Sequence, residues 1–176
     1  SLFGILTRPV GFLAAIWPAN AILIGIMARH PALSTPLGWV AAFWGYIAAD
    51  MMTGGDLGVT VWLTFANMAG AGTAYLLLMR LRRADRQLRH PSSVVYLFVI
   101  CVIAAAVAAF VGGGAALMLF DRDPVTGFAF WFTTELVNMI IVLPAILTSP
   151  AIGAGASPLP RLRGRPLRHW VPALVL

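Results

Sequence analysis

Long apolar runs separated by short polar turns dominate this chain. Several of these runs approach or exceed the roughly 20 residues that an α-helix needs to cross a bilayer, whereas the run at 37–52 is short for a span. The turns between them are rich in Pro, Gly, Ser and charged residues, which favour loops. The pattern therefore predicts an all-α, polytopic membrane bundle. Its five complete spans are expected at about 9–29, 37–52, 57–81, 93–120 and 125–148, with a sixth starting near Trp170.

One predicted span carries a carboxyl group near its middle. In residues 125–148, Glu135 is followed three positions later by Asn138, and this spacing puts both side chains on one helix face. A carboxylate at mid-bilayer depth costs roughly 2.5–3.5 kcal/mol on insertion scales, so such a helix usually turns this face into a protein interior. Pro144 is expected to kink the last turns. Glu135 is therefore the first candidate for a functional side chain.

Asparagines of other predicted spans fall at the same depth as Glu135. Asn20 and Asn67 lie within a few residues of the middle of their helices, as Asn138 does. No arginine or histidine is placed at that depth, so we expect a neutral Glu135 carboxyl that is hydrogen-bonded by asparagines. Two interpretations stay open. The layer is either a sensing or ion site, or a set of interhelical hydrogen bonds that fixes packing.

Small residues at four-residue spacing predict two close helix contacts, because they let helix backbones approach one another in lipid. The two ridges are Ala66, Gly70 and Ala74 in the third span, and Ala41, Gly45 and Ala49 in the second. Three consecutive glycines, Gly112 to Gly114, predict a distortion of the fourth span.

Composition supports the membrane assignment. The chain is 60% hydrophobic and only 10% charged, with mean hydropathy +0.89, whereas soluble domains carry about 25% charge. The net charge of +6 is not a nucleic-acid signature, because the arginines cluster in two short loops. The loop at 80–89 holds five of them and the loop at 161–168 holds four. The positive-inside rule predicts that both loops are cytoplasmic.

The residue inventory excludes several chemistries. The absence of lysine excludes a retinal Schiff base within this chain. The three histidines fall in loops, which argues against haem ligation inside the membrane. The single cysteine, Cys101, cannot form an internal disulfide. No Walker motif, zinc-type cluster or GxSxG motif is present. We therefore expect no catalytic residue, metal site or cofactor in this segment.

Three sets of residues together resemble a known family. Trp17-Pro18 is followed by Asn20, Asn67 lies in a later helix, and Trp131 precedes Glu135 and Pro144. In order and spacing this set is similar to the membrane-associated sensor family, the first of the numbered bacterial families of that name. Those domains usually have eight spans and precede diguanylate cyclases or sensor histidine kinases. The resemblance covers most of the chain.

The resemblance implies a function and a setting. Residues 1–176 would be one transmembrane sensor domain of the bacterial inner membrane, with a further helix before it and further helices and a cytoplasmic output domain after it. The domain would detect a small molecule, lipid or membrane partner. It would regulate a cyclase that makes cyclic di-GMP, which would need GTP and Mg and act as a homodimer. The expected signal-sensing residues are Trp17, Pro18, Asn20, Asn67, Trp131, Glu135 and Asn138.

Two other functions fit the sequence. A secondary transporter would use Glu135 as a proton or cation site, with helices broken at Pro18 and Pro144. A ligand-free membrane anchor would only hold and dimerise an output domain. No catalytic motif is present in this segment, and the resemblance implies that a diguanylate cyclase or histidine kinase domain lies elsewhere in the full polypeptide.

Overall fold

The computed structural model describes residues 17–120 and 123–149, which form helices and no strand. The helices are α2 (Ala19–Arg29), α3 (Pro36–Met51), α4 (Leu57–Arg80), α5 (Arg83–Arg86), α6 (Pro91–Phe120) and α7 (Pro124–Thr148). The last four predicted complete spans agree closely with α3, α4, α6 and α7. The first part of the predicted helix 9–29 and the helix near Trp170 lie outside the described residues. The short helix α5 lies where only a loop was predicted.

The starts of three helices follow from their sequence. Thr35, Asp56 and Asp123 precede α3, α4 and α7, and each side chain accepts a hydrogen bond from a backbone N–H three residues later. Pro36 and Pro124 occupy the first helical position, where a missing N–H costs nothing. Asp56 is therefore a helix cap.

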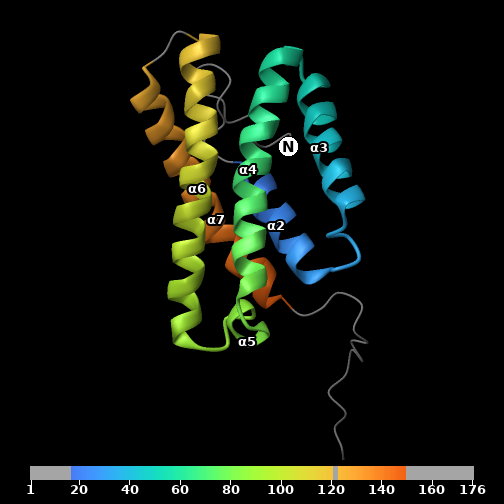
Figure 1. Cartoon of the computed structure of the whole chain (residues 1–176), viewed down its shortest axis with the longest axis vertical. Helices are drawn as coiled ribbons and strands as arrows, with labels where there is room; N and C mark the ends of the chain where they lie inside the picture. Colours follow the sequence, from blue (N-terminus) through green and yellow to red (C-terminus); the bar gives the residue numbers. More distant parts are fainter. Residues whose placement is uncertain (1–16, 121–122, 150–176) are drawn as a thin grey trace, which may run out of the picture.

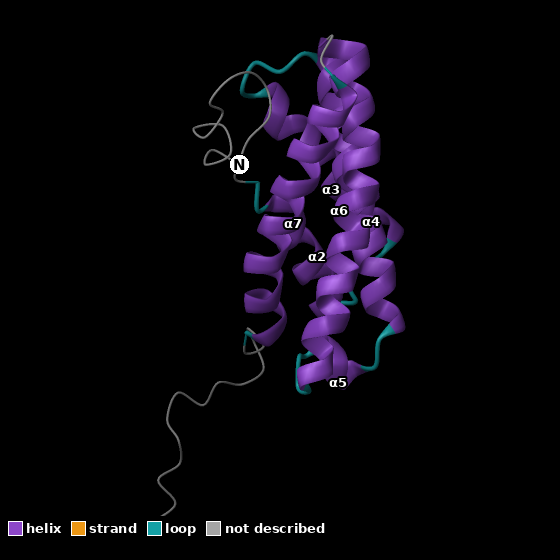
Figure 2. Ribbon diagram, turned by 90° about the vertical axis from the view of Figure 1, so that its left-hand side faces the viewer, coloured by secondary structure: helices purple, strands orange, loops and turns teal. Residues whose placement is uncertain are grey.

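The long helices α4, α6 and α7 form the body of the bundle (Figures 1 and 2). α6 packs against both α4 and α7, α2 contacts α4 and α7, and α3 packs on α4. Figure 1 shows that α2 begins partway along α4 and ends near α5, at the same end of the bundle as the last turn of α7. The first turn of α2 is thereby placed inside the bundle.

Within the part of the chain that the structure describes, three helices are long and apolar enough to cross a membrane: Leu57–Arg80, Pro91–Gly114 and Pro124–Thr148. The sequence predicted five complete spans, but α3 has only 16 residues and the described part of the first helix has 11. Large apolar side chains also face outward, among them Phe110, which is 81% exposed, and Ile141, which is 68% exposed. Such a surface is unusual for a soluble monomer and suits lipid.

Of the two predicted small-residue ridges, one is buried. Ala66, Gly70 and Ala74 face α6, and a Cβ atom at Gly70 would lie 2.8 Å from Ala108 Cβ and 3.2 Å from the carbonyl oxygen of Ala104. α4 and α6 therefore approach so closely that a side chain at Gly70 has no room.

The second ridge, of Ala41, Gly45 and Ala49, does not pack as expected. These residues are exposed, and nothing among the described residues lies within 4 Å of a Cβ atom at Gly45. The reason is that α3 meets α4 with another face. On that face Trp39 contacts Tyr75 and Phe43 contacts Phe65, with ring centroids 5.4 and 5.2 Å apart.

Two further expectations are corrected. α6 runs unbroken through the three glycines. Gly112 instead makes room for an aromatic side chain of α7, because a Cβ atom there would lie 2.5 Å from the ring of Trp131. Pro18 does not lie inside the described helix but immediately precedes it, and α2 begins at Ala19.

We expect Gly70→Leu to destabilise the bundle by about 1–3 kcal/mol or more, because the new side chain must push α4 away from α6. Gly72→Leu is the matched control, since a Cβ atom at Gly72 meets nothing within 4 Å among the described residues. The measurement is the melting temperature in detergent. Equal melting temperatures for the two variants would show that α4 and α6 do not pack in this way.

Candidate functional site

The polar side chains at the centre of the bundle meet at Asn20. Asn20 lies in the first turn of α2, and its amide Nδ2 donates to Asn67 Oδ1 at 2.9 Å and to Glu135 Oε1 at 2.7 Å. Its Oδ1 accepts a hydrogen bond from the Tyr46 hydroxyl at 2.6 Å. We call these four residues the polar network. It joins α2, α3, α4 and α7 through side chains alone.

The polar network is shielded from the surroundings. Asn20 is 1% exposed, Glu135 3% and Asn67 8%, while Tyr46 is half-buried. Buried amide and carboxyl groups are costly when unpaired, so Asn20 has a strong preference for this arrangement. Both amide hydrogens of Asn20 are used, and each goes to a different helix. The position of α2 is thus tied to the position of Glu135.

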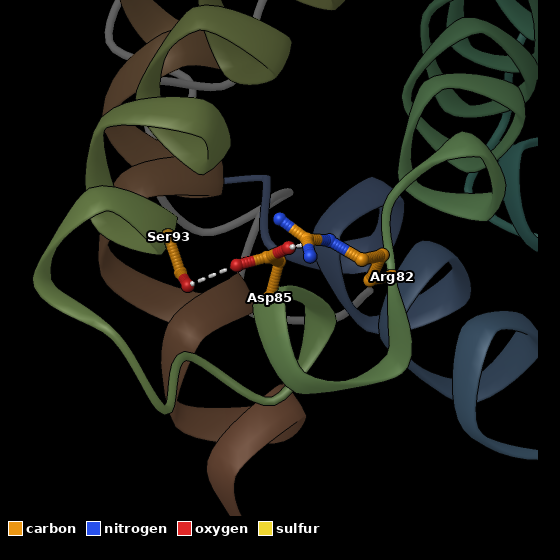
Figure 3. Close-up of polar contacts among 3 residues, drawn as sticks. All are labelled: Arg82, Asp85 and Ser93. Atoms are coloured by element: carbon orange, nitrogen blue, oxygen red, sulfur yellow. Dashed lines mark hydrogen bonds and ion pairs between the residues drawn. The ribbon is translucent and has the colours of Figure 1, made fainter.

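No cation neutralises Glu135 within residues 17–120 and 123–149. The ion pair described there lies at the end of the bundle, between Arg82 Nε and Asp85 Oδ2 at 3.5 Å (Figure 3). The hydrogen-bond partner of Glu135 is the neutral amide of Asn20. The Glu135 carboxyl group is therefore hydrogen-bonded to a neutral amide. A change in its protonation would change the net charge of the site, because no described cation lies beside it to compensate.

Neither Asn138 nor Trp131, two of the other predicted sensing residues, makes a hydrogen bond with this network. Asn138 is buried, but its Nδ2 donates to the Thr134 carbonyl oxygen of its own helix at 2.7 Å. The expected hydrogen bond from Asn138 to the carboxyl group of Glu135 is therefore not formed. Trp131, one turn before Glu135, packs in an apolar cluster with α4 and α6. Trp17 and Pro18 directly precede Ala19 and Asn20.

Sequence reasoning missed Tyr46. It stands in an apolar run, and the hydroxyl of a buried tyrosine needs a partner, which was the available signal. Thr60 and Thr64 were also missed, although they are almost fully buried and lie two turns and one turn before Asn67 on α4. Together these side chains give α4 a buried polar stripe that leads from its first turn to the polar network.

The arrangement can exchange a proton or accept a small polar group at Glu135. Within the described residues, no three His, Cys, Asp or Glu side chains lie together where they could hold a metal ion. The polar network has one titratable carboxyl group, one phenol and two amides. These groups can donate and accept hydrogen bonds in more than one pattern.

Comparison with known proteins gives one informative similarity. The chain is 27% identical over 169 residues to a probable diguanylate cyclase, DgcF, of Escherichia coli O157:H7. The alignment covers 96% of this chain and 34% of that protein, so the chain spans about a third of the relative's length. No family model matches the chain, and no solved structure matches it.

Proposed function

We propose that this chain is the membrane-embedded sensory input segment of a signalling protein whose output is cyclic di-GMP. The similarity to a probable diguanylate cyclase over nearly the whole chain supports this proposal. So does the resemblance of Trp17-Pro18, Asn67 and the Trp131–Glu135–Pro144 pattern to the first membrane-associated sensor family. The bacterial inner membrane is the setting that both imply.

The observation that carries the proposal is the polar network. A membrane anchor needs no carboxyl group in its centre, and an intramembrane ionisable residue marks a functional site by default. Here that residue is linked through one asparagine to three other helices. A proton, a small polar ligand or a membrane partner that competes for Glu135 or Asn20 would loosen α2 and shift its packing against α4 and α7.

The output chemistry belongs to another part of the full polypeptide. A cyclase domain there would bind GTP and Mg, and this segment would regulate it by changing helix positions. A homodimer is the form in which we expect the protein to act, because the resemblance implies a cyclase with active sites shared by two subunits. Lipid surrounds the apolar outer faces of the helices.

In the orientation that we propose, the arginine-rich loop after α4 is cytoplasmic and the turn after α3 is outside. A Cys101-free protein carrying Arg82→Cys should resist an impermeant thiol reagent in intact cells and react after the membrane is opened. Met52→Cys is the matched control and should react from outside. Both sites suit labelling, since the Arg82 side chain is 91% exposed and Met52 is 87% exposed. Reaction of position 82 in intact cells would reverse the orientation.

The proposed function is tested on the full-length protein in native membranes. We expect synthesis of cyclic di-GMP from GTP and Mg, at a rate that depends on this segment. Replacing residues 1–176 by an unrelated set of spans should leave synthesis intact but abolish its response to growth conditions. A full-length protein that makes no cyclic di-GMP, and instead moves protons or solutes in liposomes, would be a transporter.

A further inference from the structure

A cavity of about 620 Å³ lies at the end of the bundle where α2 and α7 end and α5 crosses. Apolar side chains and arginines make up most of its lining, which Pro31, Gln87, Thr148 and Ser149 complete. Ala28, Leu78 and Leu147 contribute apolar walls from the ends of three helices, and four arginines surround them. The arginines that line the cavity are Arg29, Arg83, Arg86 and Arg89. We call this space the arginine cavity.

The arginines have no carboxylate partner in the lining. Asp85 is the acid of this loop, and Figure 3 shows its carboxylate held between Arg82 and Ser93, with Ser93 Oγ donating to Asp85 Oδ1 at 3.0 Å. Among the described residues that line the cavity there is no Asp or Glu. Arg29 donates to the carbonyl oxygens of Ile146, Leu147 and Ser149 at the end of α7, and these neutral acceptors leave its positive charge without a carboxylate.

One of these arginines, Arg86, has an Nε–H group without an acceptor among the described residues. Arg86 Nη1 lies 3.1 Å from Met79 Sδ, a weak acceptor, and Arg86 Nε is buried with no hydrogen-bond partner among the described residues. A buried guanidinium N–H without a partner is costly. Because Nε is closed to solvent, a ligand in the cavity would meet the terminal nitrogens of Arg86. The Arg86 side chain is thus held in place by the protein, but its hydrogen-bond donors are not all paired.

We propose that the arginine cavity binds the phosphate group of an anionic ligand, with Arg86 and Arg89 as the main contacts. The planar guanidinium groups match phosphate oxygens, and several of them without a competing carboxylate favour an anion over a neutral molecule. Basic pockets between transmembrane helices on the cytoplasmic side bind anionic lipid headgroups, and this end of the bundle is cytoplasmic in the proposed orientation, on which the inference rests. The apolar walls suit the first methylene groups of the acyl chains. Free phosphate would use the same arginines.

The experiment measures binding to the purified full chain in detergent. The probes are short-chain phosphatidylglycerol, short-chain phosphatidylcholine and inorganic phosphate, and the readout is the dissociation constant from microscale thermophoresis. Phosphatidylglycerol should bind more tightly than phosphatidylcholine. Arg86→Gln and Arg89→Gln should each weaken that binding by about tenfold or more. Arg80→Gln removes the same charge from an exposed residue outside the cavity and should change it little.

The outcomes separate the two sources of phosphate. Tight phosphatidylglycerol binding that inorganic phosphate does not displace assigns the cavity to a lipid. Binding of inorganic phosphate itself, with the same dependence on Arg86 and Arg89, assigns it to a soluble phosphate compound. Equal binding of both lipids by the unaltered chain, without phosphate binding, would overturn the proposal. Equal effects of Arg80→Gln and Arg89→Gln on phosphatidylglycerol binding would also overturn the proposal. If Arg86→Gln does not fold, the exposed Arg89 still provides the test, through Arg89→Gln.

Discussion

Asn20→Ala is expected to destabilise the bundle more than any other single polar substitution in the described residues. The change removes three hydrogen bonds to three helices at once, and it leaves the Tyr46 hydroxyl, Asn67 and Glu135 without their shared partner. Interhelical hydrogen bonds in membranes contribute about 0.6 kcal/mol on average and up to about 1.7 kcal/mol each. The expected loss is therefore roughly 2–5 kcal/mol in the free energy of unfolding.

Asn138→Ala is the matched control for Asn20→Ala. Both asparagines are buried, but the amide of Asn138 donates only to a carbonyl oxygen of its own helix. Its removal should cost at most about 1 kcal/mol. Equilibrium unfolding in mixed micelles, followed by tryptophan fluorescence, compares the two variants directly. If Asn138→Ala proved as costly as Asn20→Ala, the polar network would not join the helices.

Glu135→Gln is expected to leave the stability nearly unchanged, whereas Glu135→Ala should lower it by roughly 1–3 kcal/mol. Glutamine keeps the shape of the side chain and an oxygen that can accept the hydrogen bond from Asn20 Nδ2. Alanine leaves that donor unpaired in a site that is closed to solvent. The same unfolding measurement distinguishes the two variants.

The opposite order of stability would change the picture of the site. If Glu135→Gln unfolded the protein, the carboxyl group would have to be ionised and paired with a cation from outside the described residues. If Glu135→Ala were as stable as the unaltered protein, Asn20 would hold α2 in place without the help of Glu135.

The helices were predictable because long apolar runs indicate the helices and the Pro- and Gly-rich segments between them indicate the turns. Depth was also predictable, since counting residues along a helix places Asn20, Asn67 and Glu135 in one layer. The structure brings these three into hydrogen-bond contact. Tyr46 was not found, because a tyrosine within an apolar run resembles its apolar neighbours until its hydroxyl is seen to face Asn20.

The rotation of each helix about its own axis, which decides the face that packs against a neighbour, could not be predicted from the sequence. Ala41, Gly45 and Ala49 have the same spacing as Ala66, Gly70 and Ala74, yet only the latter are buried against another helix. Aromatic pairs on another face of α3 decide how that helix turns. Asn138 shows the same limit. Its spacing from Glu135 allowed a hydrogen bond between the two side chains, but the Asn138 amide donates to the Thr134 carbonyl oxygen of its own helix instead.

The central claim, that the polar network is where a signal enters, is tested most directly by one assay on the full-length protein in membranes. The measurement is the rate of cyclic di-GMP synthesis by Glu135→Gln beside the unaltered protein, with the thermal stability of both recorded. We predict equal stability and a rate that differs by about fivefold or more, the equivalent of about 1 kcal/mol between two signalling states. Equal rates at equal stability would contradict the claim and make Glu135 a packing residue.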